Sequence, residues 1–512
     1  MLVKTYGSAV TGVNANTITV EVNISQGANF YLVGLPDAAV KESQQRIESA
    51  LREHGYKIPG KKVVINMAPA DIRKEGAAYD LTLAIGILAA SDQIIPDEVH
   101  KYIIMGELSL DGTLQPIKGV LPIAIQARAE GFEGFILPKE NAREAAVVNK
   151  LTVYGVDNIK EVIDFFDGKI QLEPTIVDTR KEFFENINKF DFDFSDVRGQ
   201  ENVKRAMEIA AAGGHNIILV GPPGAGKTML AKRLPTILPP LTLQEALETT
   251  KIHSVAGKTE KNASLVTNRP FRSPHHTISD VALVGGGGFP QPGEISLAHN
   301  GVLFLDELPE FKRTVLEVMR QPLEDRVICI SRAKFTVEYP ASFMLVASMN
   351  PCPCGYYNHP EKDCVCGSGT VQKYLNKISG PLLDRIDIHI EVVPVPFSKL
   401  SELKLSENSD SVRKRVIDAR NIQAERFKDN EGVHSNAQMS SKMIRAYCVI
   451  DAAGSALLKN AMERLGLSAR AYDRILKVSR TIADLGASEN VLPEHLAEAI
   501  QYRSLDRESW GG

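Results

Sequence analysis

The sequence is poor in cysteine and lacks any long apolar run. It holds 6 cysteines among 512 residues, and four of them cluster, which argues against the disulfide framework of a secreted protein and favours a reducing cytoplasm. No stretch approaches the roughly 18 uninterrupted apolar residues of a membrane-spanning helix, and the first residues lack the charged-then-apolar pattern of a signal peptide. We therefore expect a cytoplasmic protein that has no membrane partner.

An excess of positive charge is also missing. The net charge is −4, so no overall positive field attracts nucleic acid, and any such binding requires a local basic patch. No internal repeat with a period of 20–50 residues is present, which argues against repeat architectures. The composition is that of a globular protein, and the length suggests about two to four domains.

Four regions follow one another along the chain. Residues 1–168 mix strand-like and helix-like patterns and predict an α/β domain. Residues 169–195 carry no core pattern and are expected to be a linker. Residues 196–396 contain apolar runs typical of buried parallel strands, and residues 397–512 have a helical pattern. The predicted fold class is α/β with an α-helical C-terminal domain. Strands are predicted at 17–22, 63–67, 103–105, 134–137, 217–220, 302–305 and 343–347, and helices at 79–90 and 124–130.

Residues 221–228 fit the full pattern of a phosphate-binding loop, G-x-x-x-x-G-K-[ST]. They follow an apolar run and open a helical pattern, which is the setting that such a loop needs. Backbone N–H groups and the helix dipole favour a phosphate there, Lys227 reaches the β- and γ-phosphates, and the Thr228 hydroxyl binds Mg²⁺. The alternative is a glycine-rich turn before a helix. The residues predicted to bind ATP are Gly221, Pro222, Pro223, Gly224, Ala225, Gly226, Lys227 and Thr228.

Two further apolar runs end in polar residues. Asp306 and Glu307 follow the run 302–305, at the end where open α/β sheets bind ligands. Asp306 is predicted to hold Mg²⁺ through water, and Glu307 to orient and deprotonate the attacking water. Asn350 follows the second run, where its amide is placed to position that water. Two solvated acids and an asparagine in a turn are the alternatives.

Arginines in two segments have two interpretations each. Arg385 stands among acids, where it forms either a surface ion pair of little energetic value or a finger that completes a neighbouring subunit's site. Arg470 and Arg474 lie four residues apart and share one face of a predicted helix, and positive charge in the first turn of a helix opposes its dipole. Their position suggests a nearby anion, and a solvated basic face is the alternative.

The four clustered cysteines form two C-x-C pairs that are separated by nine residues. Four thiolates suit tetrahedral zinc, and a short loop gains order from such a metal clip. The C-x-C spacing is less common than C-x₂-C, and reduced loop thiols are the alternative. The candidate zinc ligands are Cys352, Cys354, Cys364 and Cys366.

Together these segments resemble the magnesium-chelatase-like AAA+ ATPases, and within them the YifB/ComM competence-protein family. The resemblance covers nearly the whole chain. It implies a central AAA+ P-loop domain, a helical lid and a ring that is a hexamer, with Asn350 as sensor 1, Arg385 as a finger acting in trans, and Arg470 as sensor 2. Besides the phosphate loop, it rests on DVRGQ (196–200), RPFRSPHH (269–276), GVLFLDEL (301–308), PCPCG (351–355), LLDRID (382–387) and residues 468–485.

Residues 1–168 resemble another fold, that of the Lon-protease-like domains of the S5 type. This resemblance rests on residues 74–78, 106–112 and 131–141. The protease acts through a Ser–Lys dyad, but Ala78 stands at the serine position and Leu121 near the lysine position. Neither side chain can attack a peptide or accept its proton. We therefore expect a non-proteolytic adaptor domain.

The family resemblance also implies work on DNA. Its members are linked to natural transformation, where the ring acts as a branch-migration helicase, and recombination proteins are candidate partners. Residues 327–338 predict two strands around a basic tip, whose Arg332 and Lys334 would contact DNA phosphates regardless of base sequence. A plain surface hairpin is the alternative for this segment. The alternative for the whole chain is a chelatase-like motor that remodels a protein partner for metal insertion.

Overall fold

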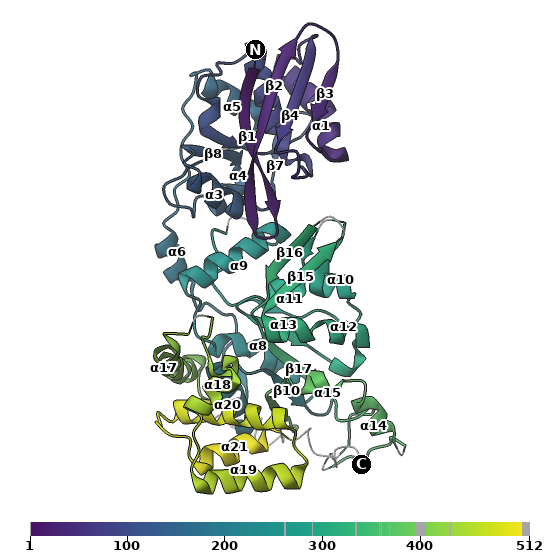
Figure 1. The fold of residues 1–512 in the computed structure, drawn as a ribbon, viewed down its shortest axis with the longest axis vertical. Coiled ribbons are helices and arrows are strands. Elements are labelled where there is room, and N and C mark those ends of the chain that lie inside the picture. The colour runs from purple at the N-terminus through teal and green to yellow at the C-terminus, as the bar shows by residue number, and fades with distance from the viewer. Residues whose placement is uncertain are drawn as a thin grey trace. The chain divides into compact units, whose positions relative to one another are not determined.

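The computed structural model folds into two compact units (Figure 1). The first consists of Met1–Asn186 and Leu243–Thr267, and the second of Ile187–Thr242 and Asn268–Gly512. No helix among the described residues has both the length and the apolar character needed to cross a membrane. The structure describes residues 2–260, 263–288, 290–332, 335–357, 359, 361–367, 369–395, 406–430 and 432–503.

The first unit is built on a seven-stranded sheet with the order β3-β4-β2-β1-β5-β8-β9. β2 pairs antiparallel with both β1 and β4, and the remaining neighbours pair parallel. Buried residues alternate with partly or fully exposed residues along β2 and β4, as expected for the strands predicted there. The strands are β1 (Leu2–Thr11), β2 (Asn14–Ser25), β3 (Phe30–Val33), β4 (Lys62–Ala68), β5 (Tyr102–Ile104), β8 (Gly134–Pro138) and β9 (Thr152–Val156).

Helix α2 (Asp80–Ala90) lies in the core of the first unit, with all of its residues buried. The predicted helix at 79–90 is thus confirmed. Gly86 allows a close approach to the sheet, since a Cβ there would lie 2.8 Å from Val22 Cγ2. Within the stretch expected to be a linker, α6 (Thr179–Asn186) buries Phe183. The other helices are α1 (Ala38–Glu53), α3 (Val120–Ala129), α4 (Lys139–Ala145) and α5 (Ile159–Phe166).

Helix α9 (Leu243–Ala256) belongs to the first unit, although it follows the phosphate loop in sequence. It packs against α3, and the backbone carbonyl of Ser254 accepts a hydrogen bond of 3.0 Å from Gly119 N. The buried Glu144 accepts hydrogen bonds from Leu121 N at 3.1 Å and from Thr259 Oγ1 at 3.3 Å. Residues 243–267 therefore form an integral part of the first unit.

The second unit contains a fully parallel five-stranded sheet with the order β11-β14-β17-β10-β18. All residues of β10, β14 and β17 are buried, which accounts for the continuous apolar runs of the sequence. These three adjacent strands carry the phosphate loop, the acidic pair and Asn350 at their carboxyl ends. The strands are β10 (Ile217–Val220), β11 (Phe271–Arg272), β14 (Val302–Leu305), β17 (Met344–Met349) and β18 (Ile388–Glu391).

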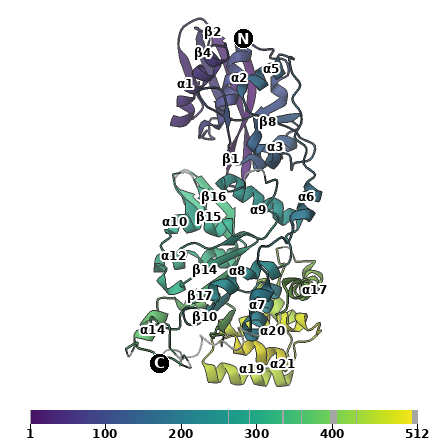
Figure 2. The same ribbon diagram turned by 180° about the vertical axis from the view of Figure 1, so that it is seen from behind.

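The C-terminal part of the second unit is helical, as predicted. The buried face of α20 packs against α17 and against α7 (Glu201–Gly213), which lies next to the sheet (Figure 2). The α/β class and the helical C-terminal part are both confirmed. The helices are α17 (Ser409–Phe427), α18 (Ser441–Tyr447), α19 (Ala452–Leu465), α20 (Ala469–Leu485) and α21 (Pro493–Gln501).

Candidate functional site

The phosphate loop connects β10 to α8 (Lys227–Ile237). Gly224 and Gly226 have φ angles of 79° and 88°, in the left-handed region that glycine adopts without strain. Gly221 is held close to the end of β18, because a Cβ there would lie 2.2 Å from Val392 O. The glycines of the motif are thus required by backbone conformation in two places and by close packing in the third.

Lys227 lies at the start of α8, with its ammonium group turned back to the loop. Its Nζ donates hydrogen bonds to Gly221 O at 2.6 Å, to Pro222 O at 3.0 Å and to Asn350 Oδ1 at 3.1 Å. Burial lowers the pKa of Lys227, while Asp306 and Glu307 act in the opposite direction. The loop therefore presents a positive charge that is already linked to the end of β17.

Asp306 accepts hydrogen bonds from two hydroxyl groups, one in the first turn of α8 and one in the neighbouring strand β17. Thr228 Oγ1 donates to its Oδ2 at 2.7 Å, and the Ser348 hydroxyl donates to its Oδ1. Oxygen donors of this kind are the ligands that Mg²⁺ prefers, so the Thr228–Asp306 pair fits the ion. A role for Ser348 was not predicted. The sequence signal that could have indicated it is a polar residue near the end of an apolar run.

Glu307 follows Asp306 and has a φ of 53°, a left-handed conformation that is uncommon outside glycine. This turn brings the Glu307 carboxylate near His276, whose Nδ1 lies 3.7 Å from Oε2. The ring of His276 also lies against that of His275, with centroids 4.0 Å apart. No role of His276 was predicted from the sequence, in which this residue stood out only as a member of the RPFRSPHH segment.

Arg385 lies largely buried, with its side chain 13% exposed. It forms an ion pair with Glu324 at 2.5 Å, and its Nη1 donates to Pro381 O at 2.5 Å. Arg470, at the start of α20, is 66% exposed and pairs with Asp384 at 3.1 Å. Within the single chain, the carboxylate of Asp384, the residue before Arg385, is thus the anion that the position of Arg470 suggested.

Asp387 anchors α20 to the sheet through a buried network. It lies 3.1 Å from Arg474 Nη1 of α20 and 2.9 Å from Nδ1 of His215, which precedes β10. The other ring nitrogen of His215 lies 2.8 Å from Thr481 Oγ1. Burial alone would raise the pKa of Asp387, but Arg474 and His215 outweigh it and hold that pKa well below its usual value. The helical C-terminal part and the strand of the phosphate loop are therefore linked by polar contacts.

The four clustered cysteines converge, as a metal site requires. Their sulfur atoms lie within 4.8 Å of one another. The distances from Cys352 Sγ are 3.3 Å to Cys354 Sγ and 3.7 Å to Cys364 Sγ, and Cys354 and Cys364 are 3.6 Å apart. Desolvation raises the pKa of the Cys354 thiol, but hydrogen bonds from the Tyr356 backbone and from Cys352 outweigh it and lower that pKa. The group of Cys352, Cys354, Cys364 and Cys366 fits a tetrahedral thiolate site.

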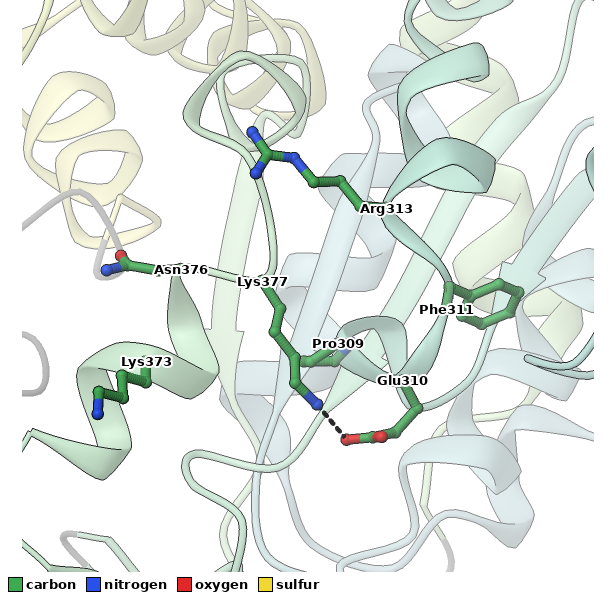
Figure 3. A pocket seen from close by; sticks show the side chains of 7 residues that line it. All are labelled: Pro309, Glu310, Phe311, Arg313, Lys373, Asn376 and Lys377. Carbon is green, nitrogen blue, oxygen red and sulfur yellow. Dashed lines mark hydrogen bonds and ion pairs between the residues drawn. The ribbon is translucent and has the colours of Figure 1, made fainter.

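A pocket of about 450 Å³ is lined in part by residues that follow Glu307 in the sequence (Figure 3). The side chains of Lys377 and Glu310 point toward one another and form an ion pair of 3.3 Å within it. No residue of the phosphate loop lines this pocket, so it is separate from the predicted ATP site. It is lined by Pro309, Glu310, Phe311, Arg313, Lys373, Asn376 and Lys377.

The predicted basic hairpin forms between β15 (Val327–Arg332) and β16 (Phe335–Pro340), which pair antiparallel. It packs beside a second hairpin of β12 (Gly285–Gly286) and β13 (Gln291–Pro292), since Tyr339 donates a hydrogen bond of 2.6 Å to Pro290 O. The side chain of Arg332 and the whole of Lys334 lie outside the described residues. The predicted DNA contacts at this tip stay predictions.

The positions of the Lon-type dyad hold no catalytic side chain. Ala78 lies in a short 3₁₀ helix (Ala77–Tyr79), and its carbonyl accepts a 2.8 Å hydrogen bond from Gly106 N. Leu121 is fully buried in α3. Lys118, three residues before it, is exposed. A hydroxyl nucleophile and an amine base are therefore missing from these two positions.

Comparisons with known proteins match an N-terminal, a central and a C-terminal segment of the chain to models of magnesium-chelatase subunit ChlI. Residues 193–400 match the family model "Magnesium chelatase, subunit ChlI", residues 20–141 match "Subunit ChlI of Mg-chelatase", and residues 406–503 match "Magnesium chelatase, subunit ChlI C-terminal". The N-terminal match, residues 20–141, lies within the first unit.

Individual relatives agree with the family models. The chain is 46% identical to competence protein ComM of Haemophilus influenzae, over 98% of this chain and 97% of that protein. It is 45% identical to the protein YifB of Escherichia coli, over 98% of this chain and 96% of that protein. It is also 31% identical to Lon protease 2 of Bacillus subtilis, over 28% of this chain and 27% of that protein, which accords with the Lon-like N-terminal region. The chain therefore belongs to the ComM/YifB family of magnesium-chelatase-like AAA+ ATPases.

Proposed function

We propose that the chain is an ATP-driven ring motor that acts on DNA, as a branch-migration helicase or translocase in the recombination of DNA taken up during natural transformation. The observation that carries the motor is the hydrogen-bonded set of Lys227, Asn350, Thr228 and Asp306 at the carboxyl ends of three adjacent strands. Similarity to a competence protein along nearly the whole chain supports the role in transformation.

In this proposal each residue of the site has a defined task. The loop backbone and Lys227 bind the β- and γ-phosphates of ATP. Thr228 and Asp306 hold Mg²⁺, which neutralises charge on the phosphates. Glu307 accepts a proton from the attacking water, and Asn350, fixed by its hydrogen bond from Lys227, orients that water.

Arg385 and Arg470 are assigned roles as the finger that acts in trans and as sensor 2. Arg385 leaves Glu324 and places its guanidinium on the γ-phosphate bound by the adjacent chain, where it stabilises the charge of the transition state. Arg470 pairs with Asp384, next to Arg385, which supports a joint role of the two arginines as finger and sensor 2. A closed ring, a hexamer, lets every subunit supply Arg385 to the site of its neighbour.

DNA contact is assigned to the tip of the β15–β16 hairpin. Arg332 and Lys334 add two positive charges per subunit to a chain that is negative overall. Their contacts would be with phosphates, so affinity depends on salt and not on base sequence. The hydrogen bond between Tyr339 and Pro290 links the β15–β16 hairpin to the neighbouring β12–β13 hairpin.

Replacing both Arg332 and Lys334 by alanine should weaken DNA binding and reduce the slope of log affinity against log salt by about two. Fluorescence anisotropy of labelled DNA at several salt concentrations measures both quantities. The matched control is the Lys459→Ala/Arg464→Ala variant, which removes two exposed positive charges from α19. Unchanged affinity in the hairpin variant would rule out the tip as the DNA contact.

A chelatase-like motor that remodels a protein partner for metal insertion is the second candidate, because the family models carry the chelatase description. The test is twofold: DNA should stimulate ATP hydrolysis, and the protein should unwind forked or four-way DNA junctions only with ATP. If DNA does not stimulate ATP hydrolysis and the protein leaves junctions intact, the chelatase-like function is supported instead.

We further propose that the first unit is a non-proteolytic adaptor. Purified protein with ATP should release no peptides from casein, because neither Ala78 nor Leu121 can perform the dyad chemistry. A Lon protease serves as the positive control. The Ala78→Ser variant should stay inactive too, since the general base is still missing. ATP-dependent peptide release by the wild type would overturn this assignment.

A further inference from the structure

The cysteine loop lies directly against the phosphate loop. It begins after Asn350 at the end of β17, and Cys352 is fully buried two residues later. At Gly355 the loop backbone touches the phosphate loop, because a Cβ there would lie 2.5 Å from Cδ of Pro223. Gly221 N also donates a hydrogen bond of 3.1 Å to Met349 O. The cysteine loop therefore contacts the phosphate loop and continues directly from the end of β17. Both of these elements belong to the proposed ATP site.

The spacing of the sulfur atoms suits one ion at their centre. Four sulfurs placed about 2.3 Å from a zinc ion in a tetrahedron lie about 3.8 Å apart. The distances among the sulfurs of Cys352, Cys354 and Cys364, which are 3.3, 3.6 and 3.7 Å, are close to this value, and Cys366 Sγ lies within 4.8 Å of each of them. Tyr357 N lies 3.3 Å from Cys352 Sγ, and backbone N–H groups that point at a sulfur stabilise its thiolate form.

We propose that these four cysteines bind one zinc ion, and that the zinc-bound loop holds the phosphate loop and Asn350 in the geometry that ATP binding requires. The second half of this inference rests on the proposed ATPase function. Zinc has no role in the chemistry of hydrolysis here. It orders the loop by linking residues near both of its ends.

The physical reason for the coupling is that the described part of the loop has no regular secondary structure. The described residues between β17 and α14 (Thr370–Leu375) contain no helix or strand. Ordering such a segment costs conformational entropy, which metal binding offsets. Without zinc, the contact at Gly355 and the position of Asn350 are lost together, so ATP affinity falls.

The metal site is tested by zinc content and ATP binding in the same samples. Wild-type protein purified under reducing conditions should contain one zinc per chain by elemental analysis. The Cys364→Ser variant should lose the metal and bind a fluorescent ATP analogue at least tenfold more weakly. A wild type without zinc overturns the site, and a zinc-free variant with unchanged ATP affinity overturns the coupling.

The coupling is tested separately by a pair of glycine variants. Gly355→Ala keeps all four thiols but pushes a methyl group into Pro223, so zinc content should stay at one while ATP affinity falls at least tenfold. Gly369→Ala is the matched control, because Gly369 also has a positive φ (73°, against 86° for Gly355) but a Cβ there meets nothing within 4 Å. Equal ATP affinity in the two variants would contradict the contact.

A Lys227→Ala variant separates this inference from the proposed function. It should retain zinc and lose ATP binding, which shows that the assay reports the phosphate loop. If the wild type binds zinc but no ATP, the proposed ATPase function and the coupling that rests on it both fail, and the zinc site alone stands.

Discussion

Glu307→Gln should slow ATP hydrolysis by about 10²–10⁴-fold, which is the usual contribution of a general base, and leave ATP binding nearly unchanged. The amide keeps the size and the hydrogen-bonding capacity of the side chain but cannot accept a proton from water. Binding is preserved because Lys227 and Asp306 are held by other partners. Steady-state phosphate release and binding of a fluorescent ATP analogue measure the two effects.

The control for this variant is Glu310→Gln. Glu310 lies three residues further on, is exposed, and pairs with Lys377 instead of facing the phosphate loop. Its replacement should change the rate little. Wild-type turnover by the Glu307 variant would mean that another group activates the water, and His276, at 3.7 Å from Glu307, is the first residue to replace.

Arg385→Ala should reduce ATP turnover by about 10³–10⁵-fold, as expected for removal of an arginine finger. Because the proposed finger acts in trans, activity should partly return when this variant is mixed with Lys227→Ala. In the mixed ring, an intact phosphate loop from one chain meets an intact Arg385 from the other. Phosphate release by each variant alone and by their mixture tests this.

Arg313→Ala is the matched control, because Arg313 is 75% exposed and pairs only with its own helix neighbour Glu317 among the contacts of the described residues. It should keep near wild-type turnover. If the Arg385 variant is inactive and mixing restores nothing, Arg385 acts within its own chain, most simply by holding Glu324.

The local parts of the site were predictable from the sequence. The phosphate loop, the acidic pair and Asn350 each follow an apolar run that is buried on both faces of the sheet, so the end of each run marked a functional position. The strand order places these three runs next to one another in the sheet, and this order depends on the whole parallel fold and not on any single run. That order accounts for the direct hydrogen bond between Lys227 and Asn350.

Contacts between distant segments were not predictable from the sequence in the same way. Ser348 and His276 meet the acidic pair only because of the folded path of the chain. The ion-pair partners of Arg385 and Arg470 follow from how α13 (Arg320–Asp325) and α20 pack. A periodic pattern reports which face of an element is buried, and it does not report what covers that face.

Helix α9 has a consequence for how this protein can be divided. Because residues 243–267 fold with the N-terminal unit, the polypeptide passes between the units three times. A fragment that stops at Asn186 would lack the helix that covers α3 and the partner of Gly119 N. Single cleavage in the 187–242 segment cannot release the first unit intact, and exchanging this unit for that of a relative requires moving both of its pieces together.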